Sequence, residues 1–144
     1  MKRSRKTVRT IATRRLRFRR TGEAVHVSLG IPEVDPDSPH RDWRCRFRIT
    51  GIDLPRVRYA YGIDAFQSLM MALAGIRSLL QPSRRDLEWQ GGSLDLAFPR
   101  FMPSGYGAAF SKRMELLVNR EVEAFAREAE RRATKRVKRG KREV

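Results

Sequence analysis

The fold is decided by one stretch, Trp43-Arg44-Cys45-Arg46-Phe47-Arg48-Ile49. Every odd position holds an apolar residue or the cysteine, and every even position holds an arginine. Successive side chains of a β-strand point to opposite faces of the sheet. The alternation therefore predicts a strand with one buried face and one solvated face lined by arginine.

The residues before this stretch predict a β-hairpin. From Ile11 onward, Leu16 and Phe18 alternate with Arg15, Arg17 and Arg19. A turn is expected at Thr21–Glu23, and residues 25–29 alternate again as a second strand. Three prolines between residues 32 and 41 predict a polar loop that leads into the central stretch.

The residues after it predict a fourth strand and a helix. Val57, Tyr59 and Tyr61 alternate with Arg56 and Arg58, which places the tyrosines on the apolar face and the arginines on the wet face. A helix over Asp64–Gln81 is expected, with Asp64 and Gln67 forming a capping box and Pro82 ending it. Its apolar stripe should pack against the apolar side of the central strand, and consists of Phe66, Leu69, Met70, Leu73, Ile76 and Leu80.

The last third predicts a short hairpin, a loop and a long helix. Leu87 to Phe98 flank Gly91-Gly92 as a hairpin, and residues 99–110 form the loop. Ser111 is expected to cap a helix that runs to about Arg139 and stops at Gly140. One face of its first half should dock on the rest of the protein, through Met114, Leu117, Val118, Val122 and Phe125.

These elements predict an α+β fold. A largely antiparallel sheet of four to five strands is packed by one buried helix and a long amphipathic C-terminal helix. Residues 11–130 form a single domain, between a basic arm at 1–10 and a basic helix end at 131–144.

The net charge of +16 lies at the two ends of the chain. Residues 1–20 carry +10 and residues 131–144 carry +7, whereas residues 21–130 sum to −1. Blocks of like charge are usually solvated until they meet a counter-charge. Their partners are nucleic acid first, an anionic membrane second and an acidic protein third.

The central strand and the helix start also carry a resemblance. The run Trp43-x-Cys45-x-Phe47 is followed by Gly62-Ile63-Asp64-x-x-Gln67-x-Leu69, with Ala72-Leu73 and Ile76 further on. This pattern resembles a small uncharacterised bacterial domain family, over roughly residues 11–98. The resemblance implies a bacterial, cytoplasmic α+β domain and brings no established activity, and the basic ends lie outside it.

Catalytic and metal-binding motifs are missing from the sequence. The histidines are His26 and His40, and no H-E-x-x-H, C-x-x-C or phosphate-binding glycine loop occurs. Cys45 is the only cysteine, so an inert buried thiol and a reducing compartment are expected. No apolar run follows the basic start, and the apolar stretch Leu69–Ile76 is too short to cross a bilayer. A cytoplasmic protein without catalytic residues, cofactor, metal or transmembrane segment is the resulting expectation.

The predicted function is low-specificity binding of RNA or DNA by the basic ends and the arginine-rich sheet face. The candidate residues are Lys2, Arg3, Arg5, Lys6, Arg9, Arg15, Arg17, Arg19, Arg44, Arg46, Arg48, Arg131, Arg132, Lys135, Arg136, Lys138 and Arg139. Alternatively, the glutamates of the C-terminal helix cover the arginine face, or the long side chains are simply tolerated there. The alternative function is a protein-interaction module, such as an immunity protein that neutralises an acidic toxin. An enzyme with its site in the Pro99–Phe110 loop is a third hypothesis.

Overall fold

The computed structural model describes residues 9–53, 57–93, 95–102 and 105–140, and it gives no side-chain placement for residues 139 and 140. The chain divides into two compact units, Met1–Phe101 and Met102–Val144, and each is described by itself. The first unit holds the sheet and one helix. The second holds one long helix.

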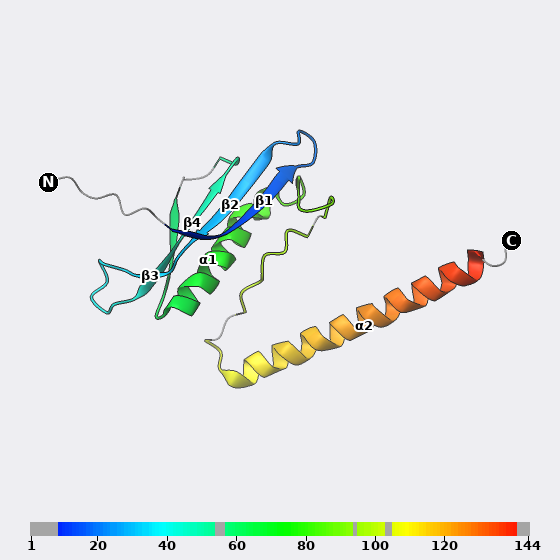
Figure 1. Ribbon diagram of the computed structural model, residues 1–144. Coiled ribbons are helices and arrows are strands. Elements are labelled where there is room, and N and C mark those ends of the chain that lie inside the picture. The colour runs from blue at the N-terminus through cyan, green and yellow to red at the C-terminus, as the bar shows by residue number, and fades with distance from the viewer. Residues whose placement is uncertain (1–8, 54–56, 94, 103–104, 141–144) are drawn as a thin grey trace. The chain divides into compact units, whose positions relative to one another are not determined.

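The sheet has six antiparallel strands (Figure 1). They are β1 (Thr10–Phe18), β2 (Ala24–Gly30), β3 (Glu33–Val34), β4 (Trp43–Thr50), β5 (Arg58–Gly62) and β6 (Leu87–Glu88). The order is β3-β4-β2-β1-β6. β2 and β3 pair with successive parts of one edge of β4, and β5 pairs with the opposite edge. The predicted α+β class and the β1–β2 hairpin are confirmed. The two-residue strand β3 was not expected, because it lies within the predicted loop 32–41.

Helix α1 (Ala65–Leu80) begins with the predicted capping pair. The Asp64 carboxylate accepts a hydrogen bond of 2.7 Å from the backbone N–H of Gln67. In return, Gln67 Oε1 accepts one of 2.7 Å from the backbone N–H of Ile63. The first bond satisfies an N–H group that a helix start would otherwise leave without a partner, and the second ties the Gln67 side chain to the residue before the cap. The helix passes into a 3₁₀ turn, η1 (Gln81–Ser83), which contains Pro82.

The face that α1 buries differs from the predicted one. The buried residues are Ser68, Ala72, Ile76 and Leu80, four positions apart, with Leu69 and Leu73 partly buried beside them. The expectation that Phe66 and Met70 pack on the sheet was wrong, because they are 79% and 51% exposed.

Small residues explain this orientation of α1. A methyl group at Gly62 would collide with the backbone N–H of Ser68, and one at Gly75 would lie 3.2 Å from the Phe47 ring. The helix therefore approaches the sheet through Ser68, Ala72 and Gly75, and the bulkier Phe66 and Met70 are turned outward. The Ser68 hydroxyl is satisfied because it donates to the Ala65 carbonyl at 2.9 Å.

The core lies between α1 and one face of the sheet. Cys45, Phe47 and Ile49 are buried as predicted, while Trp43 is only partly buried. At the β1–β2 side the core is completed by Leu87, Leu96 and Phe98. The expected hairpin around Gly91-Gly92 is shorter than predicted. It consists of β6 and a bridge between Trp89 and Ser93, and residues 95–98 continue without strand structure.

The second unit contains α2 (Ala108–Gly140). This helix begins three residues before the predicted cap. Ser111 thus lies in its first turn, where the hydroxyl donates to the Gly107 carbonyl at 3.4 Å. Docking of its apolar face on the first unit remains a prediction. No helix in the described part of the chain has the length and apolar character needed to cross a membrane.

Candidate functional site

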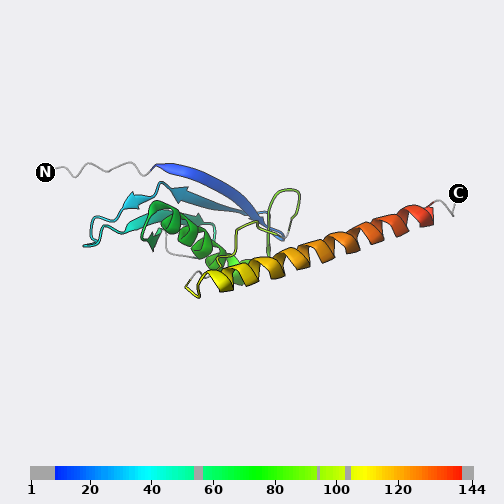
Figure 2. The same cartoon turned by 90° about the horizontal axis from the view of Figure 1, so that it is seen from below.

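The sheet face opposite α1 carries arginines predicted to line the solvated side of the sheet. Figure 2 shows α1 on one side of the sheet. Cross-strand partners share a face. The register therefore places Arg15, His26 and Thr50 in one row and Thr13, Ser28 and Arg48 in the next. Arg46 lies beside Tyr59 and Arg44 beside Tyr61. We call this surface the outer face; it comprises Thr13, Arg15, Arg17, His26, Ser28, Arg44, Arg46, Arg48, Thr50, Tyr59 and Tyr61.

Acidic residues neutralise two arginines near the margins of the outer face. Arg17 pairs with Glu88 on β6. Arg44 pairs with Glu33 at 2.7 Å and with Asp35 at 3.3 Å. Burial by itself lowers the pKa of the Arg44 guanidinium, but the hydrogen bond and charge of Glu33, with Tyr59 and Asp35, outweigh it and raise the pKa. Arg44 therefore stays charged and held in place.

The middle of the outer face retains an excess of positive charge. Among the described residues, no ion pair involves Arg15, Arg46 or Arg48. Arg15 and Arg48 are exposed, and Arg46 is partly exposed. Like charges that share one face of a sheet repel each other, so this cluster costs stability unless a counter-ion binds.

A hollow of about 230 Å³ lies within this positive region. Ser28 on β2 and Thr10 on β1 contribute small side chains, Gly30 on β2 contributes backbone alone, and Arg46 and Arg48 on β4 supply two guanidinium groups. Phe47 completes the lining. Hydroxyl and guanidinium donors around an open depression are suited to an oxyanion such as phosphate.

The predicted faces of β5 were inverted. Tyr59 and Tyr61 lie on the outer face, 38% and 55% exposed, whereas Arg58 pairs with Phe47 on the helix side at the edge of the sheet. The cause is again the close approach of α1, which accepts Ala60 and Gly62 beneath it but no larger side chain. The small residues Ala60 and Gly62, two positions apart on β5, were the sequence signal for this register. Arg56 lies outside the described residues.

The remaining predicted residues are not brought together with the outer face by any described contact. Lys2, Arg3, Arg5 and Lys6 lie outside the described residues, and Arg9 is exposed just before β1. Arg19 follows β1 and donates to the Arg85 carbonyl at 3.3 Å. On α2, exposed side chains are presented by Arg131, Arg132, Lys135, Arg136 and Lys138. Arg132 pairs with Glu128, and the backbone of Arg139 belongs to the helix.

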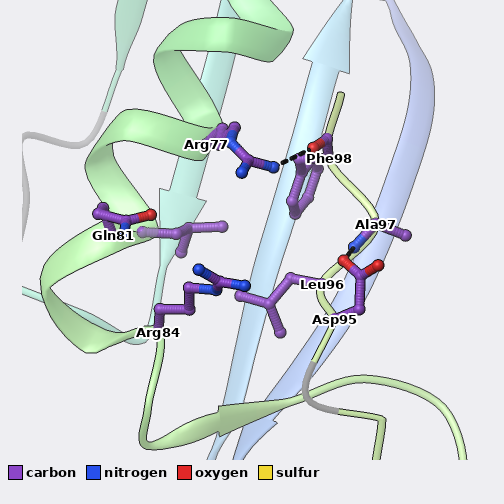
Figure 3. Close-up of a pocket in the computed structure, with 8 residues that line it drawn as sticks. Arg77, Gln81, Arg84, Asp95, Leu96, Ala97 and Phe98 are labelled. Carbon is purple, nitrogen blue, oxygen red and sulfur yellow. Dashed lines mark hydrogen bonds between the residues drawn. The ribbon is translucent and has the colours of Figure 1, made fainter. Parts of the chain in front are cut away.

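Two further arginines, which are not among the predicted site residues, hold the segment 95–98 against the core. Arg14 donates to the carbonyls of Leu96 and Ala97 at 2.9 and 2.7 Å, and stacks over the rings of Trp89 and Phe98. Arg77 donates to the Phe98 carbonyl at 2.7 Å, as Figure 3 shows. The pocket drawn there has room for about 20 Å³, close to one water molecule. These arginines are therefore structural.

Neither a metal site nor a reactive thiol is found among the described residues. No group of three or more His, Cys, Asp and Glu side chains among them is placed to hold a metal ion. Cys45 is buried, and burial raises the pKa of its thiol, which disfavours the reactive thiolate.

Comparison with known proteins identifies a family without an assigned activity. Residues 12–100 match the family described as "Domain of unknown function (DUF6968)". No curated protein and no solved structure matches the chain. The matched region contains α1, the outer face and all of the sheet apart from the first two residues of β1. It ends before α2. Because the match covers more than half of the chain, the protein belongs to the DUF6968 family.

Proposed function

We propose that this protein is a non-enzymatic, cytoplasmic nucleic-acid-binding protein of low sequence specificity. The observation that carries the proposal is the cluster of Arg15, Arg46 and Arg48 on the outer face, without acidic partners among the described residues. The basic ends of the chain add sequence-independent affinity for phosphates.

The positions of the charges predict different contributions to binding from the basic ends and from the outer face. The basic ends hold most of the excess charge and should supply most of the affinity and its salt dependence. The outer face contributes fewer charges, but they are fixed on a rigid sheet and orient the ligand. Residues 1–10 and 131–144 contain no aromatic residue that could stack on a base, so sequence specificity is expected to be weak.

The test is a salt titration of binding to duplex DNA, followed by fluorescence anisotropy. If the basic ends neutralise about eight phosphates, log K should fall against log salt with a slope of about −7. A variant with glutamine at the candidate residues of 1–10 and 131–144 should lose most of the affinity and of this slope. Glutamine keeps helix propensity, so α2 should persist in that variant.

A second variant and its control address the outer face. Arg46→Gln/Arg48→Gln should weaken binding, with a slope less negative by about 2. The control Arg113→Gln/Arg120→Gln removes the same charge from α2, outside the candidate residues, and should bind like the original protein. If the variant with glutamine at the basic ends binds as tightly as the original protein, the outer face is the principal site. Absence of any salt-sensitive binding by the unaltered protein would refute the proposal.

The alternative, a protein-interaction module such as an immunity protein, is favoured by a separate observation. Ile63, Phe66 and Met70 are exposed apolar residues at the start of α1, and exposed apolar patches often mark protein contacts. A partner bound there should be lost on Phe66→Ser and unaffected by the charge variants. This second function leads if the nucleic-acid test fails.

A further inference from the structure

We propose that the outer face selects single-stranded nucleic acid, with a phosphate in the hollow and unpaired bases stacked on Tyr59 and Tyr61. This inference rests on the proposed function and adds the class of ligand. It depends on the unexpected register of β5, which brings two exposed aromatic rings to the arginine-rich surface.

Aromatic and basic side chains lie in adjacent rows. Tyr61 and Tyr59 on β5 are the direct partners of Arg44 and Arg46 on β4. Neighbouring strands are about 4.8 Å apart, and residues two positions apart along a strand are separated by about 7 Å. Arg46 therefore borders both Tyr59 and the hollow. A single nucleic-acid strand that lies along β4 places its phosphates over the arginines, and its bases reach the tyrosines.

The Tyr59 ring is held in a fixed position. The Arg44 guanidinium lies 4.7 Å from the centroid of this ring, and its ion pairs with Glu33 and Asp35 anchor it there. Since its charge is already compensated, Arg44 acts as a positioning residue for the ring rather than as a phosphate ligand. Tyr61 is more exposed, and among the described residues no aromatic or arginine side chain stacks on it.

This arrangement discriminates between single and double strands. Bases in a duplex are stacked on one another, and side chains on a sheet surface cannot reach between them without unstacking. Unpaired bases can stack on an aromatic ring, and this contact tolerates any sequence because every base has a π-face. Basic ends alone would favour the duplex or show no preference, because they recognise phosphate charge.

The experiment compares four 12-nucleotide probes: single-stranded DNA, single-stranded RNA, duplex DNA and an abasic single strand with the same phosphates. The full chain should bind both single strands at least tenfold more tightly than the abasic strand. Tyr59→Leu/Tyr61→Leu should lose at least tenfold in affinity for the single strands, while duplex binding and the salt slope stay unchanged. Tyr106→Leu, at an exposed tyrosine of the other unit, is the matched control and should have no effect.

The outcomes separate this inference from the proposed function. If the full chain binds the abasic and natural strands equally, the stacking is refuted while nucleic-acid binding stands. That comparison needs no variant, so it holds even if the tyrosine variant misfolds. If the tyrosine variant is folded and binds single strands as tightly as the original protein, the inference is likewise overturned. If none of the probes binds, both proposals fail.

Discussion

The position of Cys45 in the sheet determines how readily its thiol loses a proton. It lies on the helix side of β4, and its sulfur is 3.5 Å from the Gly30 carbonyl, the acceptor to which it donates. Burial raises the pKa of this thiol. The folded protein therefore keeps the proton at a pH where the unfolded chain has already released it.

This difference predicts a fall in stability at alkaline pH. Above about pH 9, the ordinary value for a thiol, the unfolded state binds fewer protons than the folded state, so the free energy of unfolding decreases as pH rises. Urea melts between pH 7 and 10 should show a steeper decline for the original protein than for Cys45→Ala, which lacks the titrating group. Thiol reagents should label the native protein slowly and the unfolded protein quickly. Rapid labelling of the native protein would contradict the buried position.

The residues of the candidate site were predictable to different degrees. Arg15, Arg46 and Arg48 follow from alternation alone, because their apolar neighbours are large and must face the core. Tyr59 and Tyr61 did not, because hydrophobicity alone assigns a tyrosine to the buried face. The space beneath α1 decides which face of β5 is buried. This space depends on the contact between Gly62 and Ser68, which the alternation of apolar and polar residues along β5 does not reveal.

At the scale of elements, the order and type of the strands and helices were predictable apart from β3, but the rotation of α1 about its axis was not. Large apolar residues occupy so much of its surface that several orientations would bury a similar number of them. The shortest side chains, Ser68, Ala72 and Gly75, decide among these orientations because they let the helix approach the sheet. The start of α2 differs from the predicted one for a simpler reason: Ala108 and Ala109 extend the helix before Ser111.

Two phenylalanines give a matched test of this orientation. Phe47 is buried and lies against Gly75, so Phe47→Ala should lower the free energy of unfolding by about 3–5 kcal/mol. Phe66 is 79% exposed, so Phe66→Ala should change it by less than about 1 kcal/mol. Denaturant melts of both variants provide the comparison. Equal losses at the two positions would show that α1 is rotated relative to the structure described.

At the scale of the whole molecule, the stabilising core and the outer face belong to the first unit. All the residues of the core cluster, from Leu16 to Phe98, precede the boundary at Phe101. The family match, which ends at residue 100, agrees with this division. The second unit contributes α2, whose C-terminal residues hold much of the excess charge. The core is thus confined to the first unit, whereas the excess charge is shared by the two units, +10 in the first and +6 in the second.

The position of the core predicts that a fragment of residues 1–101 folds without α2. Its core is complete, so it should unfold in one cooperative transition in urea and retain the circular dichroism of a sheet with one helix. It should also keep the difference between natural and abasic single strands, because Tyr59, Tyr61 and the hollow are all present. Its salt slope should be less negative, because the charges of residues 131–144 are gone. A fragment that melts without cooperativity would instead show that the apolar face of α2, including Leu117, Val122 and Phe125, completes the core of the first unit.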